Sequence, residues 1–574
     1  MEFIQKKTAD NVVERFLTKA AESETPLVWD RFEGQLPECG FCETGLSCRD
    51  CLQGPCISHP FRESSKLGVC GKDKDILATQ SLLRLVLQGT MTYLDQLSDF
   101  AQGIRSGEIK PKMKAETDRI LKEIQTLLND GGREVKKEFP KPLLQLWEEA
   151  GISPEGIGRD LFKASQKLEG GMAEAEETLL WAFKTSLLGC LARKLHGSLK
   201  KSVFGETAPI KIEVNMGVLK KETPNILIYG HPSIVLKHKI AEAARKKKVA
   251  VMGVSTDPVL PPYSFSPVTN SGSQEIPLMT GAVDLIVAGD RFVNPSLAKL
   301  AKEWEVPVIS ADGLKTRKDL SRFAGEIVEQ ARKSFDFRRN ITRNIPEDKE
   351  YTIMGFSRNN LDTKKIVAAL NKGDIKGIIL LSGSNNVKYT QDQEWVIMVQ
   401  EFLKNDILCF SNGEASITLA KYGFLNSSTK EKNCSQGLMD LLTSLGKEVP
   451  PVLDLGGAEG DGMIDLLFDL VKTGKKDLKA YPILACFPEA SRSSEVTEAM
   501  WTVAMGVSTY FWPALPVTGS LKTMEALKKF CEEKFGSKLM ITTEKKMEAR
   551  SKAALVLNAL KGEEGLTLSG KPWK

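Results

Sequence analysis

Long apolar runs and a strong charge bias are both absent from this chain of 574 residues. No run reaches the roughly 18 apolar residues of a membrane-spanning helix, so no membrane span is predicted. The first residues, MEFIQKKTADNVVERF, lack the apolar core of a signal peptide. The formal net charge is only +5, and basic residues are interspersed with acidic ones, which argues against a nucleic-acid or membrane partner. We therefore expect a cytoplasmic protein.

A phosphate-binding loop is also missing. The stretch GGAEGDG at 456–462 is rich in glycine, but it has neither the GxGxxG order nor a following lysine, so it offers little support for a nucleotide-binding motif. The length allows about two to four domains, and a hydrophobic content of 41% is enough to form several cores.

Cysteine is concentrated in one short segment, 39–70, which holds six of the eleven cysteines. These are Cys39, Cys42, Cys48, Cys51, Cys56 and Cys70. Such density in a loop-rich stretch is typical of an iron–sulfur protein, because four thiolates must converge on each cubane cluster. The alternative is a zinc site or a pair of loose thiols, since CxxC pairs are common in zinc sites. Six thiols exceed the four ligands of zinc, so we predict iron–sulfur clusters and electron transfer.

The hydrophobic pattern divides the chain into three regions. Apolar residues at three- and four-residue steps, as in LLRLVLQGTMTYLDQL, predict a helical domain over 1–222 that no strand interrupts. Short β-rich runs then alternate with helical ones, which predicts a first α/β domain over 223–345 and a second over 346–574. The predicted fold class is α/β, with an amino-terminal helical domain that carries the cysteine segment, followed by two doubly wound parallel sheets.

Eight apolar runs are the predicted strands, and most end in glycine, serine or a charged residue. They are NILIYG, VAVMGV, AVDLIVAG, PVISA, GIILLSG, DILCFSNG, PVLDLGG and YPILAC. Ligands of doubly wound sheets bind outside the carboxyl ends of the strands, so we expect the chemistry of this chain in the loops that follow these runs.

Several longer segments, in order and at matching spacing, resemble the anaerobic nickel–iron carbon monoxide dehydrogenases over nearly the whole chain. They are the cysteine segment, VNMGVLKKETPNILIYGHPSIV, LMTGAVDLIVAGDRFVNPSLA, GIILLSGSNN, NDILCFSNGEASITLAKYG, PPVLDLGGAEGDG and MWTVAMGVSTYFWPALPVTGS. The hybrid-cluster proteins are a more distant likeness. The resemblance implies a homodimer whose subunits each have a helical domain and two α/β domains, and a ferredoxin-like electron carrier as partner.

The family's relay clusters correspond to the cysteine segment. By resemblance, a cubane [4Fe–4S] cluster, called B, is held by Cys48, Cys51, Cys56 and Cys70. Cys39 and Cys42 match the pair that each subunit contributes to one cluster on the dimer axis, called D. That axial cluster is either [2Fe–2S] or [4Fe–4S]. Members of the family with the closer CxxC spacing have a two-iron axial cluster, so the resemblance favours [2Fe–2S].

The family's catalytic nickel–iron cluster, called C, does not carry over in the same way. Its histidine is kept as His231, but all five of its cysteines are replaced. The matching positions are Ser255 or Thr256, Phe292, Ser384, Glu414 and Ala458. The family's lysine that assists carbon dioxide binding matches Ser494, and no histidine stands near MTYLDQL, where the acid–base histidine is expected. Nickel and low-valent iron need soft anionic ligands, so we expect no nickel and no carbon monoxide oxidation.

Two interpretations of the vacated pocket stay open. A histidine with several carboxylates is a competent site for iron, manganese or zinc, and the candidates are His231, Glu414, Glu459, Asp461 and Asp290. The Glu414 replacement resembles the mixed histidine, glutamate and cysteine ligation of hybrid-cluster proteins. The other interpretation is an ordinary polar lining, because loops are polar by default. A bulky aromatic side chain at Phe292 favours the second.

Four functions are compatible with these residues. The first is an electron-transfer protein that keeps clusters B and D and has lost the nickel–iron site. The second is an oxidoreductase with a remodelled cluster, similar to hydroxylamine reductase. The others are a carbon monoxide dehydrogenase with unexpected ligands and a non-catalytic structural subunit.

Overall fold

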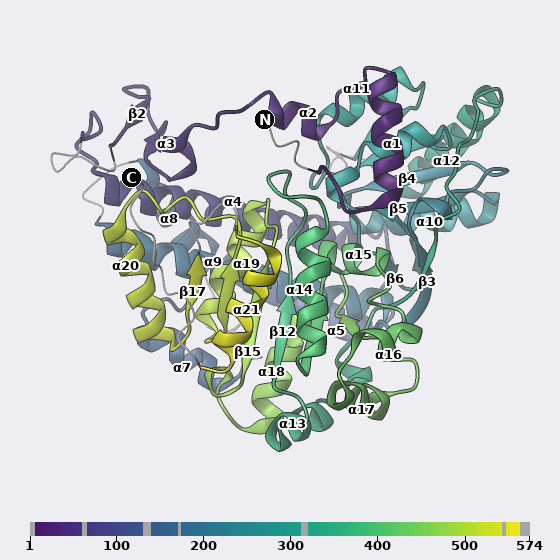
Figure 1. Cartoon of the computed structure of the whole chain (residues 1–574). Helices are drawn as coiled ribbons and strands as arrows, with labels where there is room; N and C mark the ends of the chain where they lie inside the picture. The colour runs from purple at the N-terminus through teal and green to yellow at the C-terminus, as the bar shows by residue number, and fades with distance from the viewer. Residues whose placement is uncertain are drawn as a thin grey trace.

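Helices and then two parallel sheets follow one another along the chain (Figure 1). The computed structural model describes residues 6–59, 66–129, 139–169, 174–311, 319–457, 460–541 and 547–562. The predicted α/β fold class, with amino-terminal helices before two parallel sheets, is confirmed.

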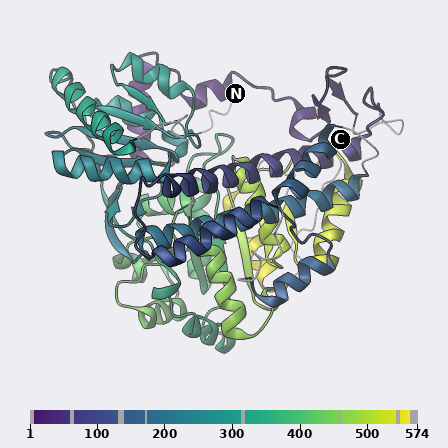
Figure 2. The same ribbon diagram turned by 180° about the vertical axis from the view of Figure 1, so that it is seen from behind.

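Two long helices, α4 (Lys74–Arg105) and α9 (Ala175–Phe204), form the centre of the helical layer and run side by side across the back of the molecule (Figure 2). Helix α9 is buried almost all round, so it is a core element and not an amphipathic surface helix. Both helices pack against α19 (Ser493–Ala504) of the second α/β region. A Cβ atom at Gly89 would lie 2.2 Å from the Thr497 hydroxyl, so the close approach of α4 and α19 requires glycine there.

The remaining helices of this layer are short. They are α5 (Lys114–Leu128), α7 (Lys141–Glu149) and α8 (Phe162–Glu169). None of the helices within the described ranges combines the length and the hydropathy that crossing a membrane requires.

The first sheet has five parallel strands in the order β10, β9, β4, β5, β8. They are β4 (Asn225–Tyr229), β5 (Ala250–Val254), β8 (Pro267–Thr269), β9 (Leu285–Ala288) and β10 (Val308–Ser310). The order reverses between β4 and β9, which makes the crevice beyond these two strands the topological switch point.

The second sheet has six parallel strands in the order β14, β13, β12, β15, β16, β17. They are β12 (Gly377–Leu381), β13 (Ile407–Ser411), β14 (Val452–Asp454), β15 (Ile483–Phe487), β16 (Ser508–Phe511) and β17 (Leu539–Ile541). This is the doubly wound order of dinucleotide-binding folds, with the switch point between β12 and β15.

Helices connect the strands of both sheets. Around the first they are α10 (Ile234–Lys247), α11 (Ser296–Glu303) and α12 (Leu320–Phe337). Around the second they are α13 (Thr363–Lys372), α14 (Gln393–Lys404), α15 (Gly413–Lys421), α16 (Lys430–Asn433), α17 (Gln436–Leu445), α18 (Gly462–Gly474), α20 (Leu521–Phe530) and α21 (Ala549–Leu560).

The amino-terminal region differs from the prediction in one respect, because strands do interrupt it. Strand β3 (Ile210–Val214) pairs antiparallel with β11 (Glu350–Met354), the first strand after the polar connection. Its sequence, IKIEV, alternates apolar and polar residues over only five positions, which is too short to stand out from helical surroundings. Two-residue strands β1 (Ser47–Cys48) and β2 (Cys56–Ile57) also form a small hairpin in the cysteine segment.

The first two helices belong to the core of the first sheet. Helices α1 (Asn11–Glu22) and α2 (Val28–Glu33) contribute Val12, Phe16 and Trp29 to the apolar cluster that includes Leu227 of β4. The chain then crosses the top of the molecule in Figure 1 to reach the cysteine segment.

A buried ionic triad joins three parts of the chain. The ammonium of Lys421, at the end of α15, lies 2.6 Å from a carboxylate oxygen of Asp10 and 2.9 Å from one of Asp392. Burial lowers the pKa of Lys421, but the two carboxylates raise it more, so the net shift is upward. The three side chains are 5% exposed or less, so each charge depends on the others.

Replacement of the central cation tests this dependence. Lys421→Met keeps the length of the side chain and leaves two buried carboxylates without their cation, so we expect the free energy of unfolding to fall by about 3–5 kcal/mol. Urea denaturation at pH 7 measures it. The exposed Lys404→Met is the control, with an expected change within about 0.5 kcal/mol. Equal stability of the two variants would contradict a structural role of the triad.

Candidate functional site

The cysteine segment begins with helix α3 (Gly40–Glu43), for which Cys39 is the residue before the first turn. The backbone N–H of Cys42 donates to the Cys39 sulfur and, as the largest cause, lowers the pKa of that thiol. A lowered pKa favours the thiolate, which is the form that binds metal. The Ser47 hydroxyl lies 3.5 Å from the Cys42 sulfur. Cys39 and Cys42 are exposed, so this pair lies at the surface of the subunit.

The other four cysteines lie in and after the β1–β2 hairpin. Cys48 faces Cys56 directly in the hairpin register, and exposed Cys51 lies in the turn between them. The backbone N–H of Val69 donates to the Cys56 sulfur at 3.5 Å, which brings the loop that carries exposed Cys70 against the hairpin. Burial raises the pKa of Cys48.

The hairpin is held to the rest of the molecule by charge. The Asp50 carboxylate accepts a hydrogen bond from the Cys48 thiol at 3.3 Å and forms an ion pair with Arg84 of α4 at 2.5 Å. Gly45, with φ +81°, lets the chain pass the Pro516 carbonyl, which would lie 1.9 Å from a Cβ atom there. The segment is therefore anchored on α4 and on the loop before α20.

The donor set fits iron–sulfur chemistry by type: six free thiols, one of them favouring the thiolate, and a backbone N–H donor to sulfur. Across the described ranges, however, no three Cys, His, Asp or Glu side chains converge in a metal-binding group. The segment brings the six cysteines onto one small substructure and does not bring their sulfur atoms to a common point.

The switch point of the first sheet holds His231 and Phe292. His231 follows β4, Phe292 follows β9, and both side chains are buried. Their rings meet edge to face with centroids 5.4 Å apart, and the Arg492 guanidinium lies 5.3 Å from the Phe292 centroid. Phe292 adopts a left-handed backbone with φ 60°, which is an outlier for a bulky residue. The position predicted to match a cysteine therefore holds a buried ring between an imidazole and a guanidinium.

Glu414 lies beside this pair at the start of α15. One carboxylate oxygen accepts the Ser271 backbone N–H at 2.8 Å, and the other is buried with no hydrogen-bond partner among the described residues. Burial raises the pKa of Glu414, although Ser271, His231 and Ser255 oppose the shift. Ser255 therefore faces the same carboxylate, whereas Thr256 accepts a hydrogen bond from the Lys237 ammonium at 2.9 Å.

The switch point of the second sheet holds Ser384, which follows β12. Its hydroxyl lies 2.7 Å from that of Ser491, in the loop after β15. The Glu495 carboxylate accepts the backbone N–H groups of Ser491 at 2.7 Å and Arg492 at 2.9 Å. Burial raises the pKa of Glu495 to about 7, against the opposing effect of the Ser384 hydroxyl.

The remaining pocket candidates are not gathered around His231 in the described chain. Ala458 and Glu459 lie outside the described residues. Asp461 is buried and pairs at 2.7 Å with both Lys194 and Lys201, and Asp290 is exposed. Ser494 is buried, and its carbonyl accepts the Tyr93 hydroxyl at 3.2 Å.

Three charged residues after β15 were missed by the sequence analysis. Arg492 and Glu495 complete the pocket described above, and Glu489 is fully buried. Burial raises the pKa of Glu489 well above its usual value, and its carboxylate accepts the Asn385 amide at 3.2 Å. The sequence does contain a signal for them, because charged residues that follow an apolar strand of a doubly wound sheet lie at the edge of the sheet where ligands bind.

A family model described as the Prismane/CO dehydrogenase family matches residues 46–129 and 101–546. The chain belongs to this family. Carbon monoxide dehydrogenase 2 of Carboxydothermus hydrogenoformans is 27% identical over 91% of this chain and 93% of its own length. Carbon monoxide dehydrogenase 1 of Methanosarcina mazei is also 27% identical, over 93% of this chain and 94% of its own length.

Solved structures agree with this membership of the Prismane/CO dehydrogenase family. Carbon monoxide dehydrogenase IV from Carboxydothermus hydrogenoformans has a TM-score of 0.90 and 26% identity, covering 97% of this chain and 99% of its own. The predicted family and fold are confirmed.

The strained Phe292 backbone can be tested by two substitutions. Both Phe292→Ala and Phe292→Gly remove the buried ring, and we expect each to lower the free energy of unfolding by about 3–5 kcal/mol. Glycine accepts φ 60° without a Cβ clash, so the glycine variant should be about 1 kcal/mol more stable than the alanine variant. Chemical denaturation measures the difference. An alanine variant as stable as the glycine variant would show that the left-handed backbone relaxes.

Glu495 should make stability depend on pH. Its folded pKa of about 7 lies above its ordinary value of 4.5, so its stabilising contribution is full below pH 4.5 and is lost as the pH rises through 7. We expect wild type to lose about 2.5 kcal/mol more than Glu495→Gln between pH 5 and pH 8. Unfolding at both pH values measures this, with the exposed Glu431→Gln as control. Parallel pH profiles for wild type and Glu495→Gln would refute the shift.

Proposed function

We propose that this member of the Prismane/CO dehydrogenase family is an iron–sulfur electron-transfer protein. In this proposal Cys48, Cys51, Cys56 and Cys70 hold a [4Fe–4S] cluster. Cys39 and Cys42 hold one half of a second cluster, [2Fe–2S] or [4Fe–4S], that two copies of the chain share across a homodimer axis. When bound, these clusters would accept and release single electrons. Six thiols on one hairpin and its flanks support this assignment.

Residues of the segment prepare the ligands in two ways. The N–H groups of the first turn of α3 favour the Cys39 thiolate, and the Val69 N–H offers a hydrogen bond to the Cys56 sulfur. Hydrogen bonds to cluster sulfur are one of the means by which a protein sets a reduction potential. Cys39, Cys42, Cys51 and Cys70 are exposed, so clusters held there would lie near the surface. That position suits electron exchange with a small ferredoxin-like carrier.

The main support for the proposed loss of the nickel–iron site is the buried Phe292 ring, which contacts both His231 and Arg492. A thiolate at that position would supply soft anionic density, whereas a phenyl ring supplies none and occupies volume. The adjacent guanidinium adds positive charge that a cationic metal centre disfavours. Neither Ser384 nor Ser255 offers a soft ligand. We infer that this pocket holds no nickel and does not oxidise carbon monoxide.

A second candidate is an oxidoreductase with a remodelled metal centre. Glu414 favours it, because one of its buried carboxylate oxygens lacks a hydrogen-bond partner among the described residues and the carboxylate lies within electrostatic reach of His231. A histidine and a carboxylate are a partial ligand set for a single iron or manganese ion. This function needs a metal in addition to the relay iron.

Metal content separates the two candidates. Anaerobically purified protein should hold about five irons per subunit and no nickel, four from the cubane and one from half of a shared two-iron cluster. Cys51→Ser should remove about four of them, because it deletes a cubane ligand. The control Cys434→Ser changes a half-buried thiol outside the segment and should leave the iron unchanged.

Redox-titrated electron paramagnetic resonance and a carbon monoxide assay with methyl viologen on the same sample complete the test. No turnover with carbon monoxide is expected. Stoichiometric nickel, or nickel-dependent turnover, would refute the electron-transfer proposal. Iron that survives Cys51→Ser undiminished would refute the cubane ligands.

A further inference from the structure

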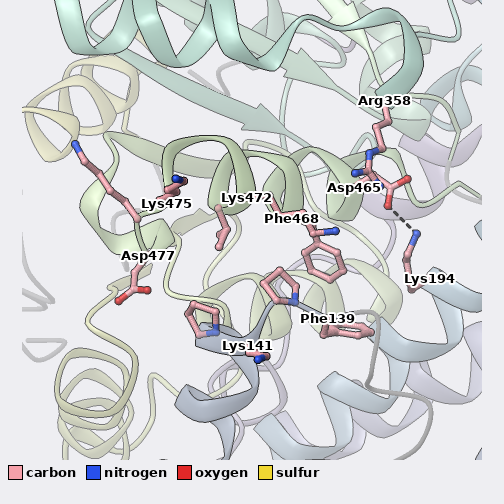
Figure 3. A pocket seen from close by; sticks show the side chains of 13 residues that line it. Phe139, Lys141, Lys194, Arg358, Asp465, Phe468, Lys472, Lys475 and Asp477 are labelled. Carbon is pink, nitrogen blue, oxygen red and sulfur yellow. Dashed lines mark hydrogen bonds and ion pairs between the residues drawn. The ribbon is translucent and has the colours of Figure 1, made fainter.

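A cleft of about 780 Å³ opens between α18, the loop that follows it, and the start of α7 (Figure 3). Helix α18 and the cysteine segment lie at opposite ends of the molecule in both ribbon views. The cleft is therefore remote from the cysteine segment, and its lining includes neither His231 nor Glu414. Its volume is in the range of small-molecule pockets, about 300–1,000 Å³.

The lining carries an excess of positive charge. Its six cationic side chains are Lys141, Lys194, Arg358, Lys472, Lys475 and Lys476. Two of the six have carboxylate partners: Lys194 lies 2.7 Å from Asp465, and Arg358 lies 2.9 Å from Asp469. The other four lysines make no ion pair with the described residues, and Asp477 is the only further carboxylate in this lining.

Four ammonium groups around a concave surface repel one another and raise the local positive potential. The position of a helix end explains two of these lysines, because Lys472 and Lys475 lie at the carboxyl end of α18, where cations stabilise the last carbonyl groups. It does not account for Lys141, which enters from the opposite wall at the start of α7. Cations converging from two elements on one hollow indicate an anionic ligand with more than one charge.

The floor of the cleft is apolar. The rings of Phe139 and Phe468 meet edge to face with centroids 4.8 Å apart. Pro140, Pro142 and Val471 extend this surface. Phe139 and Phe468 are only 4% and 3% exposed, so this apolar floor is already covered, and the lysine rim is the part of the cleft that is open to a ligand.

We propose that this cleft binds a phosphate-bearing polyanion, either a nucleotide or a free phosphate chain. The phosphates contact Lys141, Lys472, Lys475 and Lys476. Lysine ammonium groups bind phosphate as point charges. The site is independent of the relay clusters, so its occupation is measurable on protein of any redox state.

Isothermal titration calorimetry on the full chain tests this, with ATP and inorganic tripolyphosphate as probes at low salt. We expect both to bind and the affinity to fall as salt is raised. Tighter binding of ATP supports a nucleotide ligand, because of the two probes only ATP carries a base and a ribose. Equal affinities support a free phosphate chain. Absence of binding of both probes at millimolar concentration overturns the proposal.

A matched pair of variants locates the binding. Lys472→Gln combined with Lys475→Gln removes two cations from the rim, and we expect about a tenfold loss of affinity for both probes. Lys404→Gln combined with Lys534→Gln removes two exposed lysines elsewhere and should leave the affinity unchanged. All four side chains are exposed, so folding is preserved. Equal losses in the two double variants would mean that net charge and not the cleft binds the anion, which overturns the proposal.

Discussion

The arrangement of the two sheets depends on buried polar groups that must find their partners within the protein. The carboxyl ends of the strands of the two sheets approach one another. At this interface Lys421 pairs with Asp10 and Asp392, and Arg193 pairs with Glu498 at 2.5 Å. Charges buried in this way are costly unless they are paired and hydrogen-bonded. The pairs involve the amino-terminal segment, helix α9 and the second α/β region, and Asp392 also accepts a hydrogen bond from the Asn270 amide of the first α/β region at 2.8 Å.

The pocket formed by His231, Phe292, Glu414 and Arg492 meets this requirement only in part. The Phe292 ring contacts the His231 imidazole and the Arg492 guanidinium, and Glu414 accepts the Ser271 backbone N–H, but its other carboxylate oxygen has no hydrogen-bond partner among the described residues. Burial raises the pKa of both Glu414 and Glu495, so this environment disfavours negative charge on the two carboxyl groups. On the proposed function, electron transfer is confined to the cysteine segment, which α4 and the loop before α20 anchor.

The sequence predicted the fully buried strands more easily than the partly exposed ones. The central strands β4 and β12 are continuous apolar runs ending in glycine, which is the pattern of strands buried on both faces, and each lies in the run that predicted it. Strand β3 could not be recognised, because its pairing with β11 joins segments far apart in the chain. Sequence periodicity reports only on a residue's own neighbourhood.

The sequence by itself determined the family, the order of helices and sheets, and the six thiols of the cysteine segment, because local pattern and spacing encode all three. Only the tertiary structure decided that Arg492 lies over Phe292, that Glu414 lies beside His231, and that Asp461 is paired with lysines from α9. Residues from separate strand ends meet only after the sheets have formed and packed. Their contacts and shifted pKa values therefore come from long-range packing that no local pattern records.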